Sequence, residues 1–342
     1  MQAGSHLLVI RFSALGDVAM TVPVLRNLLH QHPQLEVTVL SLPFVEPLFA
    51  GIDRLHFYGV DVRQDYKGLT GIYRLSKKIK RDIPYTAIAD LHDVLRTKWL
   101  RFLLRGKCAV IDKGRAEKKE LTRRLHKQLH PLKTGFQRYA DVFAQLGYTV
   151  NLKKETGLYH PVVSTQLLPV QHPNAVWIGL APFAKHAAKM YPHAKMEAVK
   201  NLLLQNEELH ICVFASAAEA ATISHWQQEG GRLFIVAGKY KLADELNLMA
   251  QMCLMISMDS ANMHLASLLG IPVISIWGGT HPWLGFYGWG QDMGNAIQEE
   301  LPCRPSSVFG NKACPVHGNA GCMQGISAQM ITEKVRAVLH LP

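Results

Sequence analysis

Short apolar runs alternate along the chain with longer segments in which apolar residues recur every three or four positions. In the first half, the short runs predict buried strands at 6–11, 35–40, 86–90 and 109–111. The longer segments predict helices, among them an amphipathic helix that ends near Arg105. Alternating strands and helices are typical of parallel sheets with right-handed crossovers.

The alternation resumes after residues 159–174, where three prolines and weak periodicity predict an interdomain linker. This second series predicts strands at 175–180, 210–215, 233–236, 254–258 and 273–277, and helices at 196–205 and 327–339.

The two series predict an α/β chain with two doubly wound, Rossmann-like domains. We expect an N-terminal domain at 1–165, a C-terminal domain at 166–325, and a last helix at 326–342 that packs back on the N-terminal domain. Ligands of such sheets bind at the carboxyl ends of the strands, so the loops there are expected to line a shared cleft.

The composition agrees with two packed domains. The chain has 342 residues, of which 48% are hydrophobic and 18% charged, which is too long for one ordinary core and too apolar for disorder. The longest apolar stretch, 265–279, is interrupted by Gly270 and Pro272, so we expect no membrane span. Arg11 and Asp17 cut off the first apolar run, so no secretory signal and a cytoplasmic location are predicted.

The positive charge is concentrated in one region. Residues 63–133 contain 20 Lys and Arg against 7 Asp and Glu, a net +13, so the remainder of this +11 chain is at −2. This asymmetry predicts an anionic partner, such as nucleic acid, an anionic membrane or a phosphorylated substrate, with a solvated basic face as the alternative. Few aromatic residues interleave with the charges, which argues against single-stranded nucleic acid.

The loop 12–17 follows the first predicted strand and contains a single glycine, so it is no dinucleotide fingerprint. Asp17 stands where a helix begins. It could cap that helix, or it could accept a proton from a substrate at the strand end.

A second turn from strand to helix lies in 258–272. Ser260 can cap the helix and Gly270 can end it. Because Ser260 and Ala261 are small, a phosphate could approach the N–H groups of the helix start. His264, one turn further, could reach the same phosphate or could be a packed histidine.

Two more loops carry polar residues after predicted strands. Lys185 and Lys189 could pair with a pyrophosphate or could be ordinary surface lysines. Glu219 could accept hydrogen bonds from ribose hydroxyls or could favour a helix start. The chain has no D-x-D pair, so the lysines and the helix start would offset the charge of a leaving pyrophosphate without a metal.

Two segments resemble signatures of the family 9 glycosyltransferases, the heptosyltransferases. Residues 11–23 resemble the opening signature, and 258–266 resemble the second, D-[TS]-G-x-x-H-x-A. The loop 189–192 and Glu219 also fit. The resemblance implies a GT-B fold and an inverting, metal-independent transfer of heptose from ADP-heptose to the lipopolysaccharide inner core, with no cofactor.

The resemblance also implies a role for each matched residue. Asp17 would be the general base. The donor would be held by Lys189, Glu219, Asp259, Ser260, Ala261 and His264, with Asp259 on the heptose and Glu219 on the ribose. From its place in the same loop as Lys189, we expect Lys185 to bind the donor as well.

The implied acceptor is a phosphorylated glycolipid of the lipid A–Kdo type. The basic region would hold the protein peripherally at the inner face of the cytoplasmic membrane, at roughly 1 kcal/mol per basic residue. We expect Arg96 and Lys98 to bind the acceptor phosphates, and we expect no nucleic acid partner.

Two departures from the family pattern affect the expected site. Position 261 is alanine where the family usually has glycine, which a helical φ tolerates. Cys303, Cys314, His317 and Cys322 could form a zinc site, but their irregular spacing favours a loop packed near the donor, so no metal is predicted.

Two other functions remain open from the residues themselves. One is a sugar-nucleotide epimerase of the GT-B fold, which would leave the basic region without a role. The other is a non-catalytic basic module that binds anionic membrane or nucleic acid, which would make Asp17 dispensable.

Overall fold

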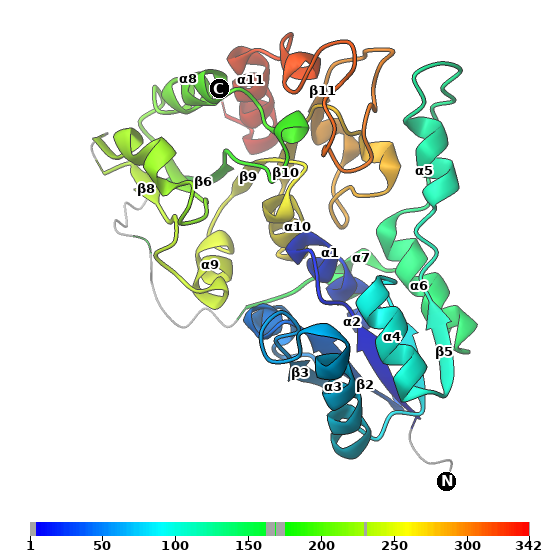
Figure 1. The fold of residues 1–342 in the computed structure, drawn as a ribbon. Helices are drawn as coiled ribbons and strands as arrows, with labels where there is room; N and C mark the ends of the chain where they lie inside the picture. The colour runs from blue at the N-terminus through cyan, green and yellow to red at the C-terminus, as the bar shows by residue number, and fades with distance from the viewer. Residues whose placement is uncertain (1–4, 162–167, 169–174, 229–230, 342) are drawn as a thin grey trace. The chain divides into compact units, whose positions relative to one another are not determined.

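The protein is described here by a computed structural model that covers residues 5–161, 168, 175–228 and 231–341 (Figure 1). Its contacts divide the chain into two compact units. The first comprises Met1–Lys113 and Gly135–Tyr159, and the second comprises Gly114–Thr134 and His160–Pro342. The predicted linker at 159–174 lies largely outside the described residues.

The first unit is built on a parallel sheet of five strands in the order β3-β2-β1-β4-β5. Residues of β1 pair with both neighbours, as Leu7 does with Val37 and Ala87. The strands are β1 (Ser5–Ile10), β2 (Leu35–Ser41), β3 (Leu55–Gly59), β4 (Ala87–Asp90) and β5 (Lys107–Val110).

The segments that connect these strands form helices because their apolar residues recur on one helical face. In α3, for example, Ile72, Leu75 and Ile79 are buried while the intervening cations are exposed. The helical segments of the unit are α1 (Leu15–Ala19), α2 (Thr21–Gln31), η1 (Pro43–Phe49), α3 (Gly68–Asp82), α4 (Leu95–Leu104), α6 (Gly135–Gln145) and α7 (Lys154–Gly157).

The second unit contains a parallel sheet of six strands in the order β11-β10-β9-β6-β7-β8. The strands are β6 (Val176–Ala181), β7 (Leu209–Val213), β8 (Leu233–Ile235), β9 (Leu254–Met258), β10 (Val273–Trp277) and β11 (Ala296–Gln298). Counted from its own first strand, this is the 3-2-1-4-5-6 order of the Rossmann fold, and the first unit follows the same order to its fifth strand. The predicted α/β class with two Rossmann-like units is confirmed.

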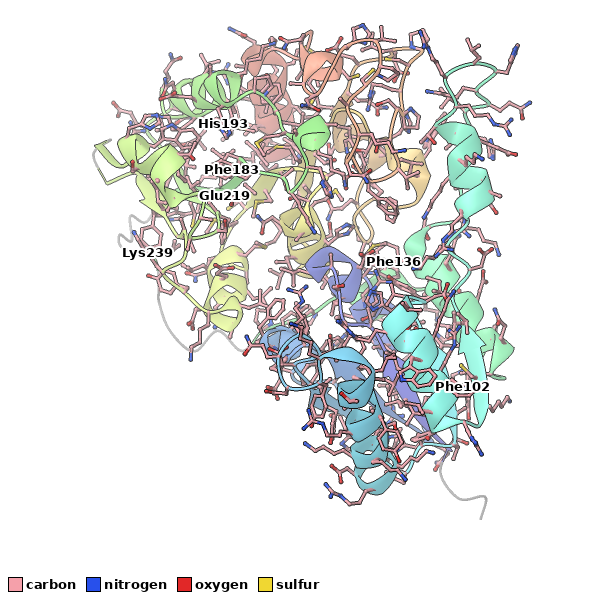
Figure 2. All side chains as sticks on the ribbon, in the orientation of Figure 1. Phe102, Phe136, Phe183, His193, Glu219 and Lys239 are labelled. Carbon is pink, nitrogen blue, oxygen red and sulfur yellow. The ribbon has the colours of Figure 1, made fainter. Side chains whose placement is uncertain are left out.

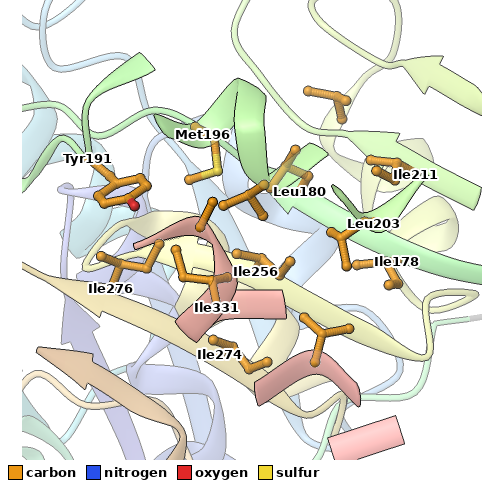
Figure 3. Packing of buried hydrophobic residues seen from close by; sticks show 14 of the residues in the cluster. Ile178, Leu180, Tyr191, Met196, Leu203, Ile211, Ile256, Ile274, Ile276 and Ile331 are labelled. Carbon is orange, nitrogen blue, oxygen red and sulfur yellow. The ribbon is translucent and has the colours of Figure 1, made fainter. Parts of the chain in front are cut away.

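The core of the second unit lies between the sheet and the helices that cover it. Figure 3 shows strand residues such as Ile178, Ile256 and Ile274 packed with Met196 and Ile331 from two helices. The helical segments are α5 (Arg115–Leu121), η2 (Ala187–Lys189), α8 (His193–Leu203), η3 (Ala220–Gln228), α9 (Leu242–Met249), α10 (Ala261–Leu268), η4 (Pro282–Leu284), η5 (Met293–Asn295), η6 (Gly321–Met323) and α11 (Ala328–Leu339).

Two segments lie in a different unit from the one expected. Helix α11 belongs to the second unit, where it packs on α8 and where Ile331 and Val335 are fully buried in the core. Residues 114–134 also belong to the second unit, where Leu121 and Leu132 form a small apolar cluster with Leu284.

Among the described residues, no helix is both long and apolar enough to cross a bilayer.

Candidate functional site

Each sheet has one point where the strand order reverses, between β1 and β4 in the first unit and between β6 and β9 in the second. Loops that leave neighbouring strands there turn to opposite faces of the sheet, which opens a crevice at the carboxyl ends of the strands. Asp17 follows β1, whereas Lys189 and Asp259 follow β6 and β9. The predicted residues therefore lie at the position where such sheets bind ligands.

The carboxylate of Asp17 is fixed by groups of the first unit. Its Oδ2 lies 2.7 Å from Nη2 of Arg11 and accepts a hydrogen bond from the Ala14 N–H at 3.2 Å. The Arg11 side chain is buried, which opposes its charge, but Tyr139 and Asp17 raise its pKa. Asp17 therefore caps α1 from inside the first turn, and the same contacts orient a carboxylate that can accept a proton.

A histidine that follows β4 lies beside this carboxylate. The Phe12 N–H is 3.4 Å from Nδ1 of His92, and the Ser13 Oγ is 3.4 Å from its Nε2. Burial, followed by the charges of Arg11 and Lys113, lowers the pKa of His92 to about 3. His92 is therefore a neutral imidazole at physiological pH, able to accept or donate a hydrogen bond without adding charge.

The predicted acceptor residues, Arg96 and Lys98, lie in α4, which begins shortly after His92. Arg96 is half-buried, and its charge contributes to the low pKa of His92. Lys98 is exposed, with its Nζ 3.8 Å from Oδ1 of Asp93. Arg96 thus belongs to the surroundings of His92, while the exposed Lys98 pairs with a largely buried acid.

A basic hollow of about 500 Å³ lies along α3. It is lined by Tyr66, Tyr73, Arg74, Lys77, Lys78 and Arg81. The four cations recur every three or four positions, so they share one face of the helix. Part of the basic region seen in the sequence is therefore gathered into one concave anion-attracting surface.

In the second unit, three loops converge on the carboxylate of Asp259. Its Oδ2 lies 2.7 Å from Nζ of Lys189 and accepts a hydrogen bond from Thr280 Oγ1 at 2.9 Å. The methylene chain of Lys189 packs so closely on Gly310 that a Cβ there would come within 2.5 Å of it. Lys189 is therefore positioned by its neighbours rather than being an ordinary surface lysine.

The turn into α10 agrees with its predicted form. Ser260 occupies the N-cap position, but its Oγ makes no capping hydrogen bond and lies instead 2.9 Å from the Oγ of Ser257. Gly270 follows the helix with a φ of +74°. Ala261 is the first helical residue, where φ is negative, so alanine fits at this position. His264 is buried, as expected for the packed-histidine alternative.

Lys185 and Glu219 occupy the loops after β6 and β7. Lys185 is exposed. The neighbouring His186 has a lowered pKa because of its own burial and, after that, the charges of Lys189 and Lys185. Glu219 accepts hydrogen bonds from the N–H and the Oγ of Ser216, at 2.8 and 2.7 Å, at the start of η3 (labelled in Figure 2). Glu219 therefore takes the helix-start role, which is one of the two roles that the sequence predicts for it.

The loop 303–322 is anchored to the ends of these strands. Arg304 is buried and donates to the carbonyl oxygens of Gly278 and Thr280, at 2.5 and 3.0 Å. Lys127 donates to the carbonyl oxygen of Cys303 at 2.8 Å. Burial lowers the pKa of both cations, Arg304 and Lys127. This loop is therefore a fixed wall beside Thr280 and Lys189.

The same loop brings together the four residues that the sequence left as an unlikely zinc site. The ligand atoms of Cys303, Cys314, His317 and Cys322 all lie within 4.8 Å of one another. Burial opposes ionisation of the Cys314 thiol, but backbone N–H groups of His317 and Val316 help to lower its pKa to about 6.

Sequence reasoning missed four residues that shape these sites. Arg11 is the last residue of the predicted strand 6–11, and His92 comes shortly after the predicted strand 86–90, so their place at the strand ends was an available signal. Thr280 and Arg304 carry no local signal, because their partners come from distant loops.

Comparison with known proteins agrees with this architecture. The family model of glycosyltransferase family 9 (heptosyltransferase) matches residues 72–316, more than half of the chain, and that range includes the second signature at 258–266. The chain is 25% identical over 322 residues to lipopolysaccharide heptosyltransferase 1 of Pseudomonas aeruginosa, covering 88% of this chain and 85% of that protein.

Solved structures share the fold at lower identity. A family 9 glycosyl transferase from Veillonella parvula superposes with a TM-score of 0.78 at 15% identity, over 99% of this chain and 98% of that one. The E. coli heptosyltransferase WaaC with ADP gives a TM-score of 0.71 at 16% identity, over 97% and 99%. The expected GT-B fold class is confirmed. The chain therefore belongs to glycosyltransferase family 9, the heptosyltransferases.

Proposed function

We propose that this glycosyltransferase moves heptose from ADP-heptose to a sugar of the lipopolysaccharide inner core, with inversion at the anomeric carbon. The observation that carries the proposal is the carboxylate of Asp17, oriented by Arg11 at the ligand-binding end of the first sheet. Family membership and the similarity to heptosyltransferases support the donor and the acceptor class.

Asp17 acts as the general base in this proposal. An acceptor hydroxyl attacks the anomeric carbon of the heptose, its proton passes to Asp17, and the bond from that carbon to the diphosphate oxygen breaks. The bonding electrons leave with ADP, and a single displacement inverts the anomeric carbon. Because the transition state of glycosyl transfer resembles an oxocarbenium ion, a carboxylate nearby also stabilises its positive charge.

The second unit binds the donor. Lys189 and the N–H groups at the start of α10 offset the charge of the departing diphosphate, with Lys185 contributing at longer range. Asp259 positions Lys189 and contacts the heptose, and Glu219 accepts hydrogen bonds from the ribose. Ser260, Ala261 and His264 surround the diphosphate. This set supports a transfer in which lysine and helix N–H groups do the work that a metal ion does in enzymes with a D-x-D pair.

The acceptor is a phosphorylated glycolipid bound by the first unit. Arg96 and Asp17 both lie close enough to His92 to influence its pKa, and the basic hollow on α3 supplies further positive charge for phosphates or anionic lipid. We propose that the protein works at the inner face of the cytoplasmic membrane, held there peripherally by this charge.

The test is turnover of ADP-heptose with a lipid A–Kdo acceptor by the Asp17→Asn variant. Loss of the base predicts a kcat about 10²- to 10⁴-fold lower than wild type. Asp65→Asn, an exposed acid of the same unit, is the matched control and keeps its rate. Equal kcat in Asp17→Asn and wild type would exclude Asp17 as the base, and formation of product with retained configuration would exclude the single displacement.

A further inference from the structure

Three thiols and one imidazole converge in the loop 303–322, outside the residues used in the proposed transfer. The Cys303 Sγ lies 3.3 Å from Nδ1 of His317 and 3.9 Å from the Cys322 Sγ. The Cys314 Sγ lies 4.0 Å from the same Nδ1. The other cysteines, Cys108, Cys212 and Cys253, are free and lie outside this group.

These separations match the edges of a tetrahedral metal site. With metal–sulfur bonds of about 2.3 Å and metal–nitrogen bonds of about 2.0 Å, tetrahedral angles place two sulfurs about 3.8 Å apart and sulfur and nitrogen about 3.5 Å apart. The Cys303–His317 separation of 3.3 Å and the Cys303–Cys322 separation of 3.9 Å lie within a few tenths of an ångström of these edges. The Cys314–His317 separation of 4.0 Å is slightly longer than the expected sulfur–nitrogen edge.

The backbone holds two of the four ligands in a preformed turn. Cys314 and Gly318 form an isolated antiparallel bridge, with N–H to O distances of 3.0 and 2.9 Å in the two directions. Gly318 takes a φ of +69°, which glycine adopts without strain. The turn thus presents Cys314 and His317 on one side. Two residues separate them along the chain, which is a short ligand spacing typical of zinc sites.

We propose that Cys303, Cys314, His317 and Cys322 bind one tetrahedral divalent metal ion, for which Zn²⁺ is the best fit. All four positions are filled by protein atoms, which is the arrangement of structural rather than catalytic zinc sites. The site therefore serves the fold, and it is compatible with a transfer reaction that uses no metal.

The position of the site in the loop indicates what the ion stabilises. The loop has little regular secondary structure, and its two ends meet at the cluster through Cys303 and Cys322. Arg304, next to the first ligand, holds the carbonyl oxygen of Thr280, while Gly310 packs on Lys189. A metal ion that cross-links the loop would thereby fix the wall against which these two donor-site residues lie.

The first experiment measures the metal in the full-length protein, purified under reducing conditions without chelators. Elemental analysis should find about one atom of zinc per chain. Iron at the same ratio would also support the site, since a tetrahedral thiolate-rich set accommodates either metal, and would correct only the ion. Removal of the ion with a chelator should lower Tm by about 5 °C or more, and added Zn²⁺ should restore it.

Variants test the ligands one at a time. His317 is exposed, so His317→Ala should remain folded while its bound metal falls at least about tenfold. His317→Cys should retain one metal per chain, and reconstitution with Co²⁺ should shift its visible absorption because a thiolate replaces the imidazole. Cys314→Ser should lose metal, whereas Cys253→Ser, an exposed cysteine outside the cluster, should keep it.

Two results would overturn the proposal. One is wild-type protein that contains no zinc or iron and takes up no stoichiometric Co²⁺, as with a Cys303–Cys322 disulfide. The other is undiminished metal in both His317→Ala and Cys314→Ser. Neither measurement involves the sugar donor, so the test of the metal site is independent of the test of the proposed transfer.

Discussion

The carboxylate of Asp17 combines two roles that the sequence presented as alternatives. Its hydrogen bond to the Ala14 N–H caps α1, and its ion pair with Arg11 fixes the direction of the same group. Capping and catalysis are compatible because each needs a carboxylate held at the end of β1. Glu219 shows the same combination. Its hydrogen bonds with Ser216 order the start of η3, and the same carboxylate is the group that we propose binds the ribose.

The Lys189–Asp259 pair gives a prediction at the scale of single residues. Both side chains are largely buried, at 14% and 4% exposed, so removing one charge leaves the other without compensation. Lys189→Met should therefore reduce the free energy of unfolding by about 3–5 kcal/mol. The matched control is Lys185→Met, four positions earlier and exposed, which should change it by no more than about 0.5 kcal/mol.

Urea denaturation of the two variants measures this difference. Equal stabilities of Lys189→Met and Lys185→Met would show that the ion pair does not hold the loop after β6.

At the scale of elements, the sequence predicted the central strands and the edge strands β5 and β8, but it missed the edge strands β3 and β11. Strands β1, β9 and β10 are almost entirely buried and mostly apolar, so their signal is local. Strand β3 contains only partly buried and exposed residues and was missed, as was α9. Edge strands bury less apolar surface, which weakens the pattern from which they could be recognised.

Helix α3 carries the prediction for the acceptor side. Lys77 and Lys78 are exposed and line the basic hollow, so the double variant Lys77→Glu, Lys78→Glu should bind anionic phosphatidylglycerol vesicles about 30-fold more weakly. Lys153→Glu, Lys154→Glu makes the same charge change on another exposed lysine pair of this unit. Vesicle co-sedimentation at constant salt compares them. Equal losses in the two variants would indicate a response to net charge rather than to the hollow.

At the scale of the whole molecule, the chain contains two Rossmann-like units, each with its own sheet and core. Because the proposed nucleotide contacts all belong to the second unit, ADP and ADP-sugars should raise its thermal stability. A ligand at 100 times its Kd adds about 2.7 kcal/mol to the stability of the unit that binds it.

A thermal-shift series with ADP, UDP, GDP and CMP measures this selectivity. Asp17→Asn should keep the response to ADP, whereas Lys189→Met should weaken it. An equal shift with all four nucleotides would contradict an adenine-specific donor site.

The sequence by itself determined the α/β class, the two series of strands and the loops that hold Asp17, Lys189 and Asp259. These features depend on local periodicity and on short motifs, which act over a few residues. Only the tertiary structure decided which residues pair, as Arg304 does with Thr280 and Asp259 with Lys189. It also decided where α11 packs and that three thiols lie together with His317. Those contacts join residues that crossovers and long loops bring together, and separation along the chain leaves no periodic trace of them.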